Sequence, residues 1–185
     1  MRSIHVSALL AAAAALALAT AAGASQTPVP PAPPAPVLAP VPAGAESLVL
    51  AAEAGVRCGQ WPAARACAES ALARRPEPGL DARAHQALAR AWRGEGEQAL
   101  ASGSGSWREA AQDFHAAALG DPNDADAWFG LARALRAGYD ATGDDQLLAA
   151  STRSTQFALG LNPRLAGARE LLRRDRSVKA KTAGL

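Results

Sequence analysis

Two stretches of the chain decide its fold: W-P-A-A-R-A-C-A-E-S-A-L-A-R-R-P at residues 61–76 and W-R-E-A-A-Q-D-F-H-A-A-A-L-G-D-P at residues 107–122. Each stretch begins with Trp, has Ala three residues later and ends with Pro. The same interval therefore separates Trp61 from Trp107 and Pro76 from Pro122. Like residues at a fixed interval indicate a repeat protein, in which each unit packs against the next.

The repeated units are helical in pattern. A third segment, F-A-L-G-L-N-P, ends at Pro163, and its Ala158 matches Ala71 and Ala117 of the two stretches above. From Ala45 onward, apolar residues recur at helical spacing, and no alternating strand pattern of useful length is present. The sequence therefore predicts an all-α fold.

The helical units resemble tetratricopeptide repeats, whose pattern is W-x2-L-G-x2-Y, then A-x3-F, then Pro. The third unit has Trp128-x2-Leu131-Ala132-x2-Leu135, and the second has His85-x2-Leu88-Ala89-x2-Trp92 followed by Ala110-x3-Phe114 and Pro122. The first unit is degenerate, with Leu48 in the place of Trp. The resemblance implies a right-handed α-solenoid of about three helical hairpins with a C-terminal capping helix.

The expected domain covers residues 45–177. Its repeats are predicted at about 45–78, 80–122 and 125–163, and the capping helix at 164–176. The second and third repeats are longer than the family's usual length of about 34 residues. The surplus residues lie around 93–106 and 138–145. We expect the first helix of each repeat to run on, or its turn to loop out, and the insertions to project from one edge of the solenoid.

The N-terminus has the three parts of a secretory signal peptide at residues 1–24. Arg2 and His5 form a short polar start, an Ala- and Leu-rich run follows, and Ala22-Gly23-Ala24 is a small-residue cleavage pattern. Cleavage is expected after Ala24; the alternative is an uncleaved membrane anchor. The preference for Arg and Ala is typical of GC-rich bacteria, so the expected location is periplasmic or secreted. No later apolar run reaches membrane-spanning length.

Two biased segments flank the predicted domain. Residues 25–44 form a Pro-rich linker, expected to be disordered, in which frequent proline prevents helix and sheet and favours a polyproline II spacer. The segment could instead be the ligand of a proline-binding groove. Residues 178–185 are expected to be a basic disordered tail, whose charge suits either an anionic surface or simple solvation of a helix end.

Cys58 and Cys67 are the only cysteines. An oxidising compartment favours a bond between them, whereas an ideal straight helical hairpin separates them by more than a disulfide allows. A resemblance to secreted cysteine-rich helical repeats, with a spacing one residue shorter, implies a staple within the first hairpin. A disulfide is expected; the alternative is two buried thiols.

No catalytic, metal or cofactor motif is present. His85 and His115 lack partners at metal-ligand spacing, and residues 103–106 lack the Lys of a phosphate loop. Asp144 and Asp145 are better explained as helix N-caps than as calcium ligands. We therefore expect no enzyme and no cofactor, with an enzyme of unrecognised type as the weakest alternative.

The family resemblance implies a concave groove lined by the first helix of each repeat. Carried onto this sequence, its partner-binding positions include Arg83, Gln86, Arg90, Arg93, Phe129, Arg133 and Arg136. Arginines around an aromatic ring suit an acidic segment or a free C-terminus. The Asn residues of the family's carboxylate clamp are missing, and the alternative is that these arginines only keep a helical face soluble.

The expected function is a protein–protein interaction scaffold or adaptor of the bacterial cell envelope. Its partner would be an unidentified protein or peptide, with an acidic segment as the best match; nucleic acid is not expected for an exported chain. The alternative is a structural spacer that tethers membrane or cell-wall surfaces through the Pro-rich arm and the basic tail.

Overall fold

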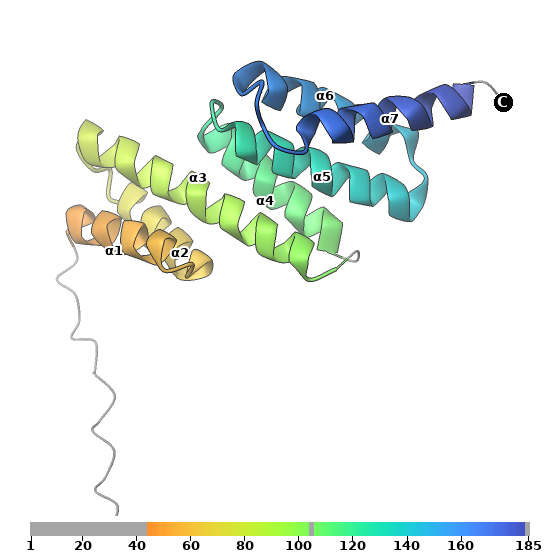
Figure 1. The fold of residues 1–185 in the computed structure, drawn as a ribbon. Coiled ribbons are helices and arrows are strands. Elements are labelled where there is room, and N and C mark those ends of the chain that lie inside the picture. The colour runs from red at the N-terminus through yellow and green to blue at the C-terminus, as the bar shows by residue number, and fades with distance from the viewer. Residues whose placement is uncertain (1–43, 104–105, 184–185) are drawn as a thin grey trace, which may run out of the picture. The chain divides into compact units, whose positions relative to one another are not determined.

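The computed structural model describes residues 44–103 and 106–183. Over these residues the fold is entirely helical, without a strand, which confirms the predicted class. Figure 1 shows the seven helices, which are α1 (Ala45–Arg57), α2 (Trp61–Leu72), α3 (Pro78–Ala101), α4 (Trp107–Gly120), α5 (Ala125–Thr142), α6 (Asp145–Leu161) and α7 (Ala168–Ala183).

The helices pack as successive antiparallel neighbours. Each helix packs against the next one along the chain, from α1 with α2 to α6 with α7. In addition, α3 contacts both α1 and α5, so the first helices of the three hairpins are also neighbours (Figure 1). A surface that runs across α1, α3 and α5 is therefore continuous.

Two predictions from the sequence lie outside the described residues: the signal peptide at 1–24 and the Pro-rich linker up to residue 43. No helix in the described part of the chain combines the length and the apolar character needed to cross a membrane.

The predicted disordered tail is wrong over the residues that the structure describes. Helix α7 continues from Ala168 to Ala183 instead of ending near residue 176. The added turns contain neither Gly nor Pro and include Lys and Ala, which favour helix. Val178 is also partly buried, so packing supports the extension.

Short polar side chains set the start of two helices. Asp124 caps α5, because its carboxylate accepts hydrogen bonds from the backbone nitrogens of Asp126 (2.9 Å) and Ala127 (3.2 Å). Asp144 caps α6 by accepting from the nitrogen of Gln146 at 2.8 Å, which confirms one of the two predicted caps. Between them, Gly143 ends α5 with a φ of 71°, a left-handed conformation that glycine adopts without strain.

The core is built mainly of Ala, with one large ring at its centre. Phe114 of α4 is completely buried, and it is the largest fully buried side chain among the described residues. It lies against Gly96 of α3 and Gly130 of α5: a Cβ added to Gly96 would lie 2.9 Å from the ring, and one at Gly130 would lie closer still. The absence of side chains at these glycines therefore lets α3 and α5 approach the ring from two sides.

The surplus residues of the longer repeats lengthen the first helices, which was one of the two alternatives expected from the sequence. These added turns do not project away from the fold. Gly94 lies under the Trp61 ring, and Gly138 lies under Trp107, where an added Cβ would be 2.7 Å from the ring. The C-terminal parts of α3 and α5 thus pack against the Trp that begins the second helix of the preceding repeat. The expectation of projecting insertions is wrong, because these turns take part in the packing between repeats.

The expected disulfide is also wrong, since Cys58 and Cys67 are not bonded. Cys58 caps the C-terminus of α1 and is exposed, whereas Cys67 lies six residues beyond the start of α2, about 9 Å along its axis. The two cysteines therefore lie at different heights along the hairpin, one at its turn and one within α2. The alternative of two buried thiols fails as well, because Cys67 is only partly buried.

Substitution of Gly130 by Ala tests the close packing at Phe114. Ala is the better helix former by about 1 kcal/mol, but the added methyl would overlap a ring that cannot move into solvent. Overpacking of this kind costs about 1–3 kcal/mol, so we expect a lower free energy of unfolding in urea titrations.

Gly160→Ala is the matched control, because Gly160 is also helical and nothing lies within 4 Å of its added Cβ. This variant should be as stable as the wild type or more so. Equal stability of the Gly130 and Gly160 variants would contradict the packing described for Phe114.

Candidate functional site

A hollow of about 810 Å³ lies between α3 and α5. We call it the α3–α5 groove, and α1 and α2 contribute one residue each to its wall. Its lining consists of Val56, Trp61, Arg90, Arg93, Gly94, Glu97, Gln98, Ala101, Asp126, Phe129 and Arg133. The groove therefore combines two aromatic rings with charges of both signs.

The structure brings together four of the seven residues that the sequence assigned to partner binding. Arg90, Arg93, Phe129 and Arg133 all line the α3–α5 groove. The other three, Arg83, Gln86 and Arg136, are not part of its wall.

Arg83 joins two helices instead. Its Nε and Nη2 atoms donate to both carboxylate oxygens of Glu53 on α1, each at 2.9 Å. This hydrogen bonding lowers the pKa of the Glu53 carboxyl. The pair is a bidentate link between α1 and α3, so its arginine is not free for a ligand carboxylate.

Arg136 anchors α7. Its Nη1 donates at 2.7 Å to Asp175, which is completely buried, and Ser151 donates to the other carboxylate oxygen, also at 2.7 Å. Nε of the same guanidinium donates to Asp140 at 3.0 Å. Although burial opposes the charge, these carboxylates raise the pKa of Arg136. A buried carboxylate with two donors requires its partners, so Arg136 has a structural role.

Two of the groove arginines are partly neutralised by nearby carboxylates. Nη1 of Arg93 lies 3.1 Å from Asp124 and 3.4 Å from Asp126, and Nη1 of Arg133 lies 3.0 Å from Glu97. The Arg133 guanidinium is also 6.0 Å from the centre of the Phe129 ring. Spacing along the sequence did not identify Glu97 or Asp124 as partners, because both belong to a neighbouring helix.

Arg90 differs from the other groove arginines. It is exposed, and within the described part of the chain it makes no hydrogen bond or ion pair; its charge acts at longer range to lower the pKa of Glu53. Because it has no ion pair among the described residues, Arg90 is the position in this groove best able to receive a ligand carboxylate.

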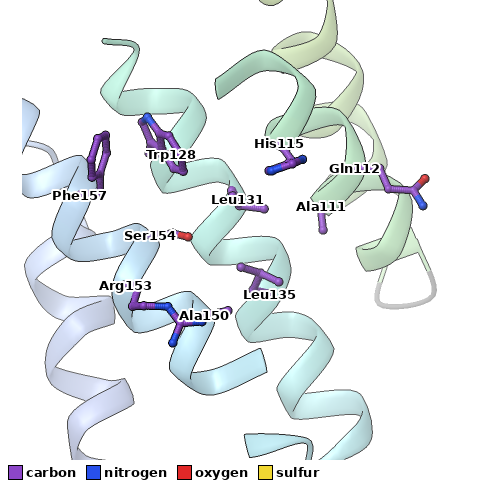
Figure 2. A pocket seen from close by; sticks show the side chains of 10 residues that line it. All are labelled: Ala111, Gln112, His115, Trp128, Leu131, Leu135, Ala150, Arg153, Ser154 and Phe157. Atoms are coloured by element: carbon purple, nitrogen blue, oxygen red, sulfur yellow. The ribbon is translucent and has the colours of Figure 1, made fainter. Parts of the chain in front are cut away.

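A second hollow, of about 490 Å³, lies between α4, α5 and α6, and sequence reasoning missed it. We call it the α4–α6 groove. Trp128 and Phe157 face each other at its upper end, with ring centres 4.6 Å apart (Figure 2). Its full lining is Ala111, Gln112, His115, Trp128, Leu131, Leu135, Ala150, Arg153, Ser154 and Phe157.

The α4–α6 groove is largely apolar. Phe157 remains half exposed, and the Trp128 indole donates at 3.0 Å to the carbonyl of Pro122. His115 and Arg153 point toward the groove, whereas Gln112 points away (Figure 2). The sequence feature that could have indicated this groove is Phe157, an aromatic residue next to the buried Ala158 of α6.

Two carboxylates lie close together between α3 and α4. Burial, followed by the charge of Glu95, raises the pKa of Asp113 to about 6. The positive charge of Arg65 on α2 partly opposes this rise in the pKa of Asp113. The Arg65 Nε lies 3.3 Å from Glu95, and its guanidinium is 4.4 Å from the centre of the Trp92 ring. The contact with Glu95 is an ion pair without hydrogen-bond geometry, since Oε1 of Glu95 has no hydrogen-bond partner. The cluster links α2, α3 and α4 electrostatically.

No protein-family model and no curated protein matches this chain. Among the described residues, no group of three or more His, Cys, Asp or Glu side chains is arranged to hold a metal ion. The two grooves are therefore the features from which a function can be argued.

The substitution Arg136→Ala tests whether Arg136 stabilises the fold by anchoring α7 and does not bind a partner. Without Arg136, Asp175 would be buried with only hydroxyl partners, and breaking a buried ion pair costs about 3 kcal/mol or more. We expect a clear loss of stability in urea unfolding and earlier proteolysis of α7.

Arg133→Ala is the control, because its pair with Glu97 is about half exposed and should contribute less than about 1 kcal/mol. If the two variants lost equal stability, the anchoring role of Arg136 would be refuted.

Proposed function

We propose that this chain is a non-enzymatic scaffold of the bacterial cell envelope that holds a segment of a partner protein in the α3–α5 groove. The observation that carries the proposal is the groove itself, whose lining includes Phe129, Trp61 and Arg90, an arginine without an ion pair in the described part of the chain. Aromatic anchors and arginine are the residues that contribute most at protein interfaces.

The proposal includes the fold type, a tetratricopeptide-like solenoid, and the packing of the helices supports it. Helical hairpins follow one another, and α3 contacts the first helices of both neighbouring hairpins. Small residues lie at the close crossings, as where Gly55 of α1 meets Ala64 of α2. In such repeats, successive first helices form the concave binding surface, which here corresponds to the α3–α5 groove.

The charges of the groove favour a partner segment with a carboxylate next to an apolar anchor. A carboxylate would pair with Arg90, while an apolar side chain would contact Phe129. Glu97 and Asp126 add negative charge at the same surface. A uniformly acidic segment is therefore a poorer match than one with a single acidic residue at the correct position.

The envelope location rests on the signal peptide predicted at residues 1–24, with cleavage after Ala24. Export would place the groove in the periplasm or outside the cell. There its partner would be an envelope protein.

A second function is favoured by helix α7. Its exposed basic residues are Arg169, Arg173, Arg174, Arg176, Lys179 and Lys181. Of its two acidic residues, Asp175 is buried against Arg136, and Glu170 pairs with Arg173 at 2.6 Å. The outer face of α7 is therefore basic, which suits a spacer that tethers the chain to an anionic membrane or cell-wall surface.

Capture of partners from an envelope extract distinguishes the two functions. We expect wild-type chain to retain a partner at physiological salt, and Arg90→Glu/Arg133→Glu to retain at least about tenfold less, because charge reversal opposes a ligand carboxylate. Retention is measured by quantitative mass spectrometry, after circular dichroism has shown equal helicity.

The matched control is Arg169→Glu/Arg174→Glu, which makes the same change in charge on α7, outside the groove. This variant should retain the partner. Loss of capture only in the α7 variant would replace the scaffold with the surface spacer, and equal capture by all three chains would show that the groove arginines are a solvated surface.

A further inference from the structure

The α4–α6 groove offers rings and donors but no carboxylate. Trp128 and Phe157 provide an aromatic end, and Leu131 and Leu135 continue the apolar floor. The Arg153 guanidinium and the His115 imidazole point toward the groove (Figure 2), and neither side chain makes an ion pair within the described residues. We therefore expect a ligand that is largely apolar and rich in hydrogen-bond acceptors.

The Pro-rich segment at residues 27–42, T-P-V-P-P-A-P-P-A-P-V-L-A-P-V-P, has this chemistry. It carries no charged side chain, and each proline lacks a backbone donor but keeps its carbonyl acceptor. Polyproline II has about three residues per turn. A polyproline II conformation would align Pro28, Pro31 and Pro34 on one edge, and Pro30, Pro33 and Pro36 on the next.

We propose that the α4–α6 groove binds the Pro-rich segment, residues 27–42, of a second copy of this chain. Proline rings pack on the Trp128 and Phe157 rings, as in other aromatic grooves that recognise polyproline II. Arg153 and His115 donate to the carbonyls that the polyproline II backbone leaves without partners. This interaction uses a surface separate from the α3–α5 groove and does not depend on the proposed scaffold function.

The position of α1 favours a second copy as the source. The segment leads into α1, which packs on α2 and α3, whereas the groove is formed by α4, α5 and α6. If Pro28 to Pro36 bound the groove of their own copy, residues 37–43 would be the whole link from the groove to α1, about 22 Å long as polyproline II. A segment from a second copy has no such restriction, and reciprocal exchange would close a symmetric dimer.

Sedimentation velocity of the chain from residue 25 onward, over a range of concentrations, tests the proposal. The wild type should self-associate, and an excess of synthetic peptide 27–42 should dissociate it. Phe157→Ala should weaken both self-association and peptide binding about tenfold, since it removes an aromatic anchor. Because Phe157 is half exposed, this variant should still fold, and circular dichroism checks that it does.

Leu119→Ala is the matched control, because Leu119 is an exposed apolar residue of α4 outside the groove lining. It should associate and bind peptide as the wild type does. The proposal fails if the wild type neither associates nor binds the peptide, or if Phe157→Ala binds normally. It also fails if only a chain lacking residues 27–42 binds the peptide while the complete chain remains a monomer, since the segment would then occupy its own copy.

Discussion

Close approach of helix backbones at Phe114 is the constraint on which the rest of the fold depends. The ring is completely buried, with Gly96 and Gly130 against it and Ala110 and Ala134 in the same cluster. A core of such small residues loses little side-chain entropy on folding, but each contact buries little apolar area. Its stability therefore depends on how closely the helices approach, and a methyl group at a crossing matters more than in a core of large side chains.

Arginine pairs add a second set of links between the odd-numbered helices. Arg83 joins α3 to α1, Arg93 and Arg133 join α3 to α5, and Arg136 joins α5 to α7. The exposed pairs contribute little to stability, whereas the buried Arg136–Asp175 pair fixes α7. Among the arginines that line the α3–α5 groove, Arg90 is left without an ion pair in the described structure. The arginines of the odd-numbered helices therefore act mainly as links between helices, and the proposed function assigns partner binding to Arg90.

The helical class could be predicted because it follows from local pattern. The interval between Trp61 and Trp107 and the A-x3-F position of Phe114 identified packed units before their arrangement was known. The arginine positions on the first helices were predicted, but their ion-pair partners were not. Asp175 lies 39 residues from Arg136, and nothing in their spacing shows that packing brings them together. The same limit explains why the α4–α6 groove was missed.

Other expectations failed for physical reasons that are visible in single elements. The disulfide was inferred from a resemblance, but Cys58 lies at the end of α1, Cys67 lies within α2, and the two are not bonded. The tail at residues 178–185 was expected to be disordered, yet helix propensity and the partly buried Val178 continue α7 to Ala183. In both cases, geometry and packing outweighed composition.

Site-specific photo-cross-linking tests most directly whether a partner occupies the α3–α5 groove. A photoreactive residue in place of Gln98, within the groove, should form a covalent adduct with the partner, whereas one in place of the exposed Gln146, at the start of α6, should not. An adduct that forms only from Gln98 is the predicted result. A partner that cross-links from Gln146 and not from Gln98 would contradict the account and place its contact outside the α3–α5 groove.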